Sequence, residues 1–190
     1  MTRTPNLRYV DPHKKRGRLY LAFCRFSATK LAAWLSVHVM WKVDPLLLKV
    51  TGGRFCCTGP VPTALLDTRG GRTGQVRRNA AIYFNDGERV TVVASNRGLP
   101  KNPDWYYNLR KHPDVLLGGV PFRAEVVQGE AERRRLWDLA DRVFPQYVDF
   151  RDRAARAGRI IPIIRLIPPL DLRCLATRDC PTPFMKGTSS

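Results

Sequence analysis

A series of short apolar segments joined by tight turns constrains the fold of this chain more than any other feature. Asn85-Asp86-Gly87 is a strong hairpin signal, and Gly118-Gly119 is a second one. The segments of strand length around these turns are 64–68, 79–84, 89–95, 115–117, 122–127 and 160–167. They do not alternate with helices in the manner of βαβ units. The sequence therefore predicts an α+β fold, a small antiparallel β-barrel with helices packed on its outside.

Helical patterns lie between and after these strands. Asp104 is a suitable N-terminal cap for a helix that ends before His112-Pro113. Residues 130–144 start with acidic residues and then show one apolar face, and residues 144–157 continue as a further helical segment. We expect these helices to flank the barrel.

Four parts can be distinguished along the 190 residues. Residues 1–18 mix prolines with basic residues and are predicted to form a flexible basic arm without core contacts. Residues 19–52 are predicted to form an amphipathic helical extension, and residues 53–170 the barrel domain. Residues 171–190 are predicted to be an unstructured tail.

The helical extension carries an apolar stripe bordered by cations. Such a helix can cover one end of the domain or lie on an anionic membrane, and both roles stay open. Its longest largely apolar stretch, 31–41, is shorter than the roughly 20 residues that span a bilayer. Arg25 interrupts the apolar run 19–26, so we see no export signal. The prediction is a cytoplasmic protein, with peripheral contact at the inner membrane face as an open alternative.

The charge of the chain restricts what it can bind. The chain has 33 Lys+Arg and 16 Asp+Glu, a formal charge of +17 that attracts phosphates, polycarboxylates, nucleic acid or acidic lipids. Its five cysteines form an odd set without C-x-x-C spacing, which favours a reducing compartment over a disulfide framework. The three histidines are not at metal-ligand spacing from any cysteine, so no metal site is predicted.

The stretch RGGRTGQVRRN, residues 69–79, joins the first two predicted strands and contains four arginines and three glycines. Glycine lets backbone N–H groups turn toward a ligand, and arginine offers paired donors to phosphate or carboxylate oxygens. The stretch lacks the lysine and the Ser/Thr of a Walker loop, and also the spacing of a dinucleotide-binding loop. It fits a polyanion site, with an ordinary charged hairpin tip as the alternative.

The stretch ASNRGLPKNPDWYYNL, residues 94–109, combines a strand end, a turn of small residues, two cations and the start of an aromatic helix. The helix N-terminus adds a partial positive charge and backbone donors in the same corner. Aromatic residues at this spacing belong more often to a core than to a ligand platform, so both roles stay open.

Together with HPDVLLGG, FPQYVDF and IPIIRLIP, these two stretches occur in the order and spacing of the deazaflavin-dependent nitroreductases. From about Val50 to Pro168 the chain resembles this family of actinobacterial oxidoreductases, which bind coenzyme F420 in a split antiparallel β-barrel of the FMN-binding, pyridoxamine-phosphate-oxidase-like type. The resemblance implies an F420-dependent reductase of the nitroreductase or quinone reductase type. Hydride would pass from reduced F420 to a quinone, a nitroaromatic or another activated acceptor, and residues 53–170 would be the deazaflavin-binding domain.

The resemblance also implies a cofactor site. The phosphate and polyglutamate tail would lie on the arginine-glycine loop, and the deazaflavin ring would lie beside the strand that follows it. The pyrimidine edge would meet the backbone after the third strand, and the start of the aromatic helix would border the cofactor. The residues implied in these contacts are Arg72, Thr73, Arg77, Asn79, Ala80, Ile82, Val93, Ala94, Ser95, Asn96, Asp104, Trp105 and Asn108. Gly71 and Val76 depart from a basic residue and a proline of the family, which could loosen the tail site.

The acceptor side of the implied site differs from that of the studied relatives. Where those relatives have three tyrosines over the substrate, this chain has Phe144, Tyr147 and Phe150. The resemblance makes Tyr147 the catalytic candidate, which would donate a hydrogen bond to an acceptor carbonyl or help to protonate the product, with core packing as the alternative. The two phenylalanines suit an apolar quinone and argue against nitroimidazole activation that needs the lost hydroxyls.

Two other functions stay open at this point. FMN could take the place of F420, as in related split barrels. The charge of +17, with the aromatic residues near 101–107, would also suit a basic nucleic-acid-binding module, although no RNA or DNA motif is present and no specific nucleic acid is expected. The oligomeric state does not follow from the sequence.

Overall fold

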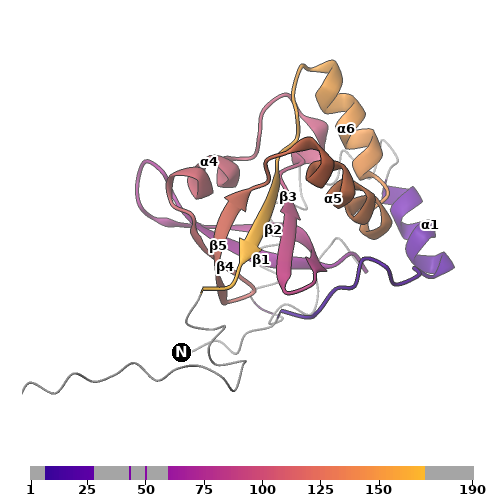
Figure 1. Cartoon of the computed structure of the whole chain (residues 1–190), viewed down its shortest axis with the longest axis horizontal. Helices are drawn as coiled ribbons and strands as arrows, with labels where there is room; N and C mark the ends of the chain where they lie inside the picture. Colours follow the sequence, from indigo (N-terminus) through magenta and orange to yellow (C-terminus); the bar gives the residue numbers. More distant parts are fainter. Residues whose placement is uncertain (1–6, 28–42, 44–49, 51–59, 170–190) are drawn as a thin grey trace, which may run out of the picture.

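Six short strands close into the barrel that the turn pattern predicts. The computed structural model describes residues 7–27, 43, 50 and 60–169. In these residues the barrel runs in the order β1-β2-β3-β6-β5-β4, with each neighbouring pair antiparallel (Figure 1). The strands are β1 (Thr63–Arg69), β2 (Val76–Asp86), β3 (Arg89–Val93), β4 (Asp114–Leu117), β5 (Val120–Val126) and β6 (Ile163–Ile167). The predicted antiparallel barrel with outer helices is confirmed.

Side-chain alternation directs the apolar residues of these strands into the core. In β4, Val115 and Leu117 are buried while Leu116 between them is exposed, and β5 repeats this pattern with Phe122 and Ala124. β6 begins at Ile163 rather than at 160, because the preceding proline has no N–H to donate to a ladder. β2 begins earlier than predicted, because its arginines continue the pairing with β1.

The helices lie around the outside of the barrel (Figure 1). The helices are α1 (Arg18–Ser27), α4 (Asp104–Lys111), α5 (Glu130–Val143) and α6 (Tyr147–Arg156), with a 3-10 turn η2 (Asn96–Gly98). α6 begins at Tyr147 rather than at 144, since the chain is extended at Phe144, where φ is −144°, and turns again after Pro145. α5 and α6 therefore form a helical hairpin on one side of the barrel.

The N-terminal segment packs against the barrel. Val10 is buried, its N–H donates to Asn85 Oδ1 at 2.8 Å, and its carbonyl accepts the Asn85 N–H at 2.9 Å. The Tyr83 hydroxyl donates to the Arg8 carbonyl at 2.9 Å. The prediction of an arm without core contacts is therefore wrong for this part of residues 1–18, because β2 supplies distant partners for its backbone groups. Residues 1–6 lie outside the described residues.

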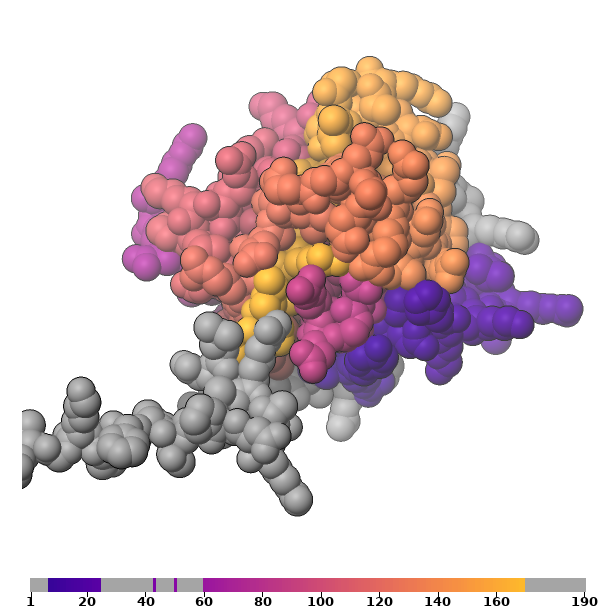
Figure 2. All heavy atoms as spheres, viewed as in Figure 1, coloured from indigo at the N-terminus to yellow at the C-terminus, as the bar shows by residue number. Residues whose placement is uncertain are grey.

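α1 covers the junction between α5 and α6. The Tyr20 hydroxyl donates to the Val143 carbonyl, and Gln146 Nε2 donates to the Cys24 carbonyl at 2.5 Å. Figure 2 shows the indigo N-terminal part of the chain against the orange part that contains α5 and α6. The start of the extension thus covers one end of the domain, whereas nearly all the remaining extension and the tail 171–190 lie outside the described residues. No helix in the described part of the chain is long and apolar enough to cross a membrane.

Candidate cofactor site

The loop between β1 and β2, residues 70–75, is held in shape by its own backbone. The Gly70 N–H donates to the Gln75 carbonyl at 2.8 Å, and the Gly74 N–H donates to the Gly70 carbonyl at 2.9 Å. Gly74 has a φ of 69°, a left-handed conformation that favours glycine. The loop is therefore a closed turn, and Figure 1 shows it beside α4.

Two side chains of α4 fasten this loop. Asn108 Oδ1 accepts the Gly71 N–H at 3.0 Å, and Asn108 Nδ2 donates to the Thr68 hydroxyl at 3.3 Å. Lys111 Nζ donates to the Gly71 carbonyl at 2.6 Å. Asn108, implied as a neighbour of the cofactor, thus orients the loop. Nothing in the local sequence marks Lys111 for this role, because a basic residue in the last turn of a helix is ordinary.

The arginines around the loop differ in their partners. Arg78 pairs with Asp67 across β1 and β2, with Nε 3.3 Å from Oδ2. Arg72 and Arg77 are exposed and form no ion pair with any of the described residues. The exposed Thr73 accepts a backbone N–H of the loop at 3.4 Å, which leaves its hydroxyl proton available. Two guanidinium groups that have no carboxylate partner among the described residues therefore lie in and beside the loop that is predicted to bind an acidic tail.

The strand predicted to pass the deazaflavin ring presents two different faces. Ala80 and Ile82 lie on one face of β2 and Asn79 lies on the other, because side chains alternate along a strand. All three residues are half-buried. A flat ring on one face could therefore touch the side chains of Ala80 and Ile82 or that of Asn79, but not all three.

The turn after β3 has an unusual backbone and is packed closely on α6. Asn96 and Arg97 have φ values of 43° and 54°, which are uncommon for residues other than glycine, and Gly98 follows with 77°. A Cβ at Gly98 would lie 2.6 Å from the Phe150 carbonyl oxygen and 2.8 Å from the Arg153 Cβ. Only glycine fits at this contact. Such conformations persist where neighbouring contacts impose them, and they are often found at functional sites.

Only part of this segment is open to a ligand. Val93 and Ala94 are buried in the core, and the Ala94 N–H already donates to the Pro162 carbonyl at 3.0 Å. Ser95 and Asn96 are half-buried. The resemblance implies that the backbone of residues 93–96 meets the pyrimidine edge. The Ala94 N–H is already hydrogen-bonded within the protein, so Ser95 and Asn96 are the accessible residues of this segment.

The first turn of α4 has a buried and an exposed side. Trp105 and Tyr106 are buried, whereas Asp104 is exposed and Tyr107 has 52% of its surface exposed. The Trp105 ring is therefore a core side chain here. The Asp104 carboxylate offsets the partial positive charge of the helix N-terminus.

Tyr147 is enclosed by aromatic rings. Its ring centroid lies 5.2 Å from that of Phe144, 5.9 Å from that of Trp137 and 6.2 Å from that of Phe150, all in edge-to-face geometry. The side chain keeps 2% of its surface, and burial raises the pKa of Tyr147 well above its ordinary value. These contacts match the core-packing alternative, so a catalytic role for Tyr147 stays a prediction.

A protein-family comparison decides the class of this site. Residues 48–168 match the family of F420H2-dependent quinone reductases. The chain belongs to this family. An F420H2-dependent quinone reductase of Mycobacterium tuberculosis is 31% identical over 146 residues, which cover 71% of this chain and 98% of that protein. A second protein of the same organism, named for the same activity, is 40% identical over 113 residues, 57% of this chain and 92% of its own.

Two solved structures are also similar to this quinone reductase family member. One is an F420-H2 dependent reductase (FDR-A), with 29% identity over 55% of this chain and 93% of that chain, at a TM-score of 0.47. The other, described as a domain-swapped dimer, has 24% identity over 72% of this chain and 99% of that chain, at a TM-score of 0.50, and supports the fold alone. Family membership confirms the predicted F420-dependent oxidoreductase class, with quinones as acceptors and F420 as cofactor.

The described residues fit the anionic part of F420. The closed glycine loop is fastened to α4, and Arg72 in the loop and Arg77 beside it have no carboxylate partner in the part of the chain that the structure describes. The turn η2 packs on α6, and the chain continues from it into α4. The structure therefore links the loop, α4 and the segment 95–98 into one continuous arrangement, and it buries Tyr147, the first residue of α6, in the core. No cluster that could hold a metal ion occurs among the residues that the structure describes.

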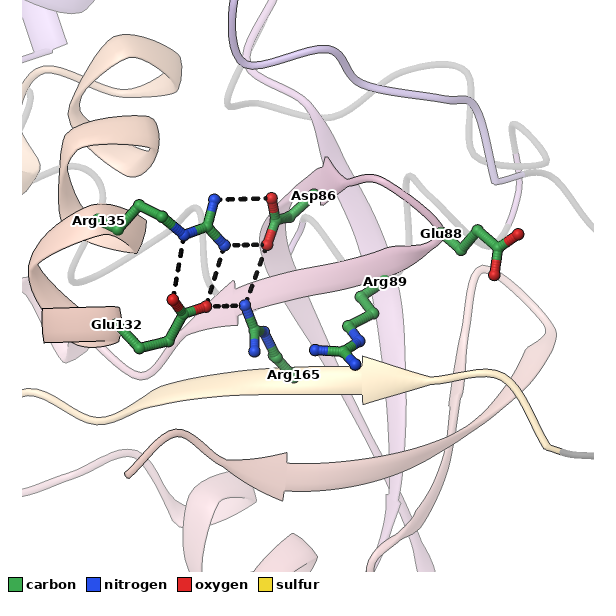
Figure 3. A pocket seen from close by; sticks show the side chains of 6 residues that line it. All are labelled: Asp86, Glu88, Arg89, Glu132, Arg135 and Arg165. Atoms are coloured by element: carbon green, nitrogen blue, oxygen red, sulfur yellow. Dashed lines mark hydrogen bonds and ion pairs between the residues drawn. The ribbon is translucent and has the colours of Figure 1, made fainter. Parts of the chain in front are cut away.

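A second polar site lies at the opposite end of β2 from the arginine-glycine loop. It is an open depression of about 590 Å³. Figure 3 shows the side chains that line it, which are Asp86, Glu88, Arg89, Glu132, Arg135 and Arg165. Arg135 donates to Asp86 Oδ1 at 3.0 Å and to Glu132 Oε2 at 3.1 Å, and Arg165 Nη2 donates to Asp86 Oδ2 at 3.1 Å. The network joins α5 to β2 and β6, and it contains none of the predicted cofactor residues.

Substituting Asp86 by asparagine should destabilise the fold in a pH-dependent manner. Hydrogen bonds from Arg135 hold the pKa of the Asp86 carboxyl below its ordinary value. Its contribution is therefore present above the unfolded pKa of about 3.9 and is lost as the pH falls through the lower folded value. We expect D86N to lower the free energy of unfolding by about 1–3 kcal/mol near neutral pH, and the difference from the unsubstituted chain to shrink in acid. Urea unfolding across this pH range measures both effects.

Asp114→Asn is the matched control for that experiment. Asp114 pairs with Arg123 at 3.5 Å, but the two side chains have 84% and 63% of their surface exposed. Exposed pairs contribute less than about 1 kcal/mol. Equal losses in D86N and D114N, or a D86N loss that does not change with pH, would contradict a stabilising role for the network.

Proposed function

We propose that this protein reduces a quinone with hydride from reduced F420, and that the loop 70–75 with Arg72 and Arg77 binds the phosphate and carboxylate groups of the coenzyme. The observation that carries the proposal is a pair of exposed guanidinium groups beside a glycine loop of defined shape, with no carboxylate among the described residues to neutralise them. Guanidinium groups bind phosphate and carboxylate oxygens through two parallel hydrogen bonds. When bound, F420 supplies the hydride from C5 of its deazaflavin ring.

The residues of the chain then bind the coenzyme and orient its ring. The Thr73 hydroxyl can donate to a phosphate oxygen, since the hydrogen bond that it makes within the loop uses it as an acceptor. In this proposal the half-buried Ser95 and Asn96 meet the pyrimidine edge, and the half-buried Ala80 and Ile82 contact the ring. Alignment of the ring and the acceptor is the main contribution that a protein makes to hydride transfer from a bound coenzyme.

Parallel titration of the full chain with F420 and FMN tests this proposal. Saturable binding of F420 followed by turnover of a quinone supports it. Preference for FMN would favour the alternative cofactor, and salt-sensitive binding of oligonucleotides without F420 binding would favour a nucleic-acid-binding module. Nitroaromatic acceptors, also predicted from the resemblance, belong in the same turnover panel as the quinones.

A catalytic role for Tyr147 predicts a specific loss of turnover. Burial keeps its phenol protonated, so the hydroxyl can act as a hydrogen-bond donor once an acceptor reaches it. Contact requires the surrounding rings or α1 to move aside. We expect Y147F to lower kcat with a quinone by about tenfold or more and to change the stability little, since the ring is kept. Steady-state kinetics with reduced F420 measures this.

Tyr83→Phe provides the control for that substitution. Tyr83 is also a buried tyrosine, but its hydroxyl donates to the Arg8 backbone on the N-terminal segment. Y83F should leave kcat unchanged and lower the stability by about 1 kcal/mol. If kcat of Y147F equals that of the unsubstituted chain, Tyr147 is a core residue and not a catalytic one.

Peripheral contact of residues 19–50 with an anionic membrane is also part of the proposal. Leu19 has 89% and Leu21 38% of its surface exposed, and Arg18 and Arg16 lie close to them in sequence. An apolar surface beside cations suits the interface of an anionic bilayer. Co-sedimentation of the full chain with anionic vesicles, compared with neutral vesicles, tests this contact, and no binding to either would contradict it.

A further inference from the structure

Arg159 follows α6 after Ala157 and Gly158, at a position that is set by the way this helix ends. Gly158 has a φ of 68°, and its N–H donates to the Ala155 carbonyl at 2.9 Å. The Arg159 N–H donates to the Ala154 carbonyl at 2.8 Å. This pair of bonds is the Schellman motif, which ends a helix in one defined geometry. The backbone of Arg159 is therefore fixed relative to α6.

The guanidinium of Arg159 joins both ends of the segment between β3 and α4. Its Nη2 donates to the Ser95 carbonyl, and its Nη1 donates to the Lys101 carbonyl at 2.8 Å and to Asn102 Oδ1 at 3.0 Å. Asn96 Nδ2 also donates to the Lys101 carbonyl, at 2.8 Å, so both lone pairs of that oxygen are used. A rigid, planar group with several donors suits such a bridge better than the ammonium of lysine.

This bridged segment holds the accessible part of the implied ring contact. Its backbone is left-handed at Asn96 and Arg97, a conformation that needs support from its surroundings. The segment leads directly into α4, whose Asn108 fastens the arginine-glycine loop. Arg159 therefore acts on a segment that connects the two halves of the implied cofactor site, although it lies outside every motif that the sequence singles out.

We propose that Arg159 is a positioning residue of the cofactor site, which braces the segment between β3 and α4 so that Ser95 and Asn96 meet the deazaflavin ring. The cofactor part of this inference rests on the proposed function, whereas the brace itself is a property of the chain alone. Arg133 is the matched control. It also donates to a backbone carbonyl, that of Ile161 at 3.0 Å, and it makes no hydrogen bond to the segment among the described residues.

Amide hydrogen exchange on the full chain without cofactor tests the brace. The Gly98 N–H donates to the Ser95 carbonyl at 2.9 Å, and the Leu99 N–H donates to the Asn96 carbonyl at 3.0 Å, so both amides report on the order of the segment. We expect Arg159→Met to accelerate their exchange by about tenfold or more, and Arg133→Met to leave it unchanged. Equal exchange in R159M and the unsubstituted chain would overturn the brace.

Binding of F420 tests the positioning role. We expect the Kd for F420 to rise about tenfold in R159M and by less in Arg159→Lys, and to stay within about twofold in R133M. The KM for reduced F420 should rise with it while the KM for the quinone does not. If R159M and R133M lose similar thermal stability and both bind F420 with the affinity of the unsubstituted chain, the positioning role of Arg159 is overturned. Failure of the unsubstituted chain to bind F420 would instead contradict the proposed function, and the exchange result would stand by itself.

Discussion

Replacing Arg72 and Arg77 together by alanine is expected to weaken the binding of F420 by about a hundredfold or more. Each guanidinium can donate charge-assisted hydrogen bonds to the phosphate or to the carboxylates of the coenzyme, and such bonds contribute about 1.5–3 kcal/mol each. Neither side chain supports the fold through an ion pair with the described residues, so the stability should change little. Fluorescence titration with F420 and thermal unfolding of the same samples measure the two effects.

Arg78→Ala is the control, because it removes the same charge from the neighbouring position. Arg78 alternates with Arg77 along β2 and pairs with Asp67 at 3.3 Å. R78A should therefore lower the affinity for F420 only slightly, through the loss of net charge. If R78A weakens binding as much as the double substitution, the loop has no specific role and the overall positive charge accounts for binding. If the double variant binds F420 with unchanged affinity, the loop 70–75 is not part of the cofactor site.

Replacing Gly98 by alanine is expected to lower the free energy of unfolding by about 3 kcal/mol or more. The new Cβ would lie 2.6 Å from the Phe150 carbonyl oxygen, which belongs to the backbone and cannot turn away, and the φ of 77° is strained for alanine. Relief of the clash would push η2 away from α6 and shift Ser95 and Asn96 with it. Urea unfolding measures the loss of stability, and a higher Kd for F420 would accompany it.

Gly87→Ala separates the two causes. Gly87 has a φ of 62°, close to that of Gly98, but a Cβ there would meet nothing within 4 Å. G87A should therefore show only the backbone strain, about 1 kcal/mol. The additional decrease in the free energy of unfolding of G98A over that of G87A measures the clash at the contact between η2 and α6. If G98A and G87A lower the free energy of unfolding equally, the contact between η2 and α6 rearranges without an energetic penalty and does not hold the segment 95–98 in place.

The features that could be predicted from the sequence are those with a local cause. The hairpin at Asn85-Asp86-Gly87 needs a left-handed residue, and Gly87 supplies it at the expected place. The burial alternation of Val115 and Leu117 is likewise visible in the apolar pattern. The apolar pattern predicts the start of β2 too late, because arginines carry no apolar signal and only the pairing with β1 shows that they belong to the strand.

The contacts that could not be predicted join residues far apart in the chain. Val10 and Asn85 exchange two hydrogen bonds, and Arg159 donates a hydrogen bond to the Ser95 carbonyl. No periodicity or motif in the sequence predicts either pair. The enclosed position of Tyr147 has the same origin. An aromatic residue at that spacing fits a core as well as a substrate surface, and only the neighbours that pack around it distinguish the two.

The amino-acid sequence by itself determined the antiparallel barrel and the arginine-glycine loop, because turns, strand alternation and charge are properties of neighbouring residues, whereas the class of cofactor followed from the resemblance to the family. The tertiary structure alone decided which arginines have no carboxylate partner among the described residues, which amides are already hydrogen-bonded and how closely Gly98 packs against α6. These depend on which groups meet across the fold, since an ion pair or a close contact is defined by distance in space and leaves no trace in the order of residues.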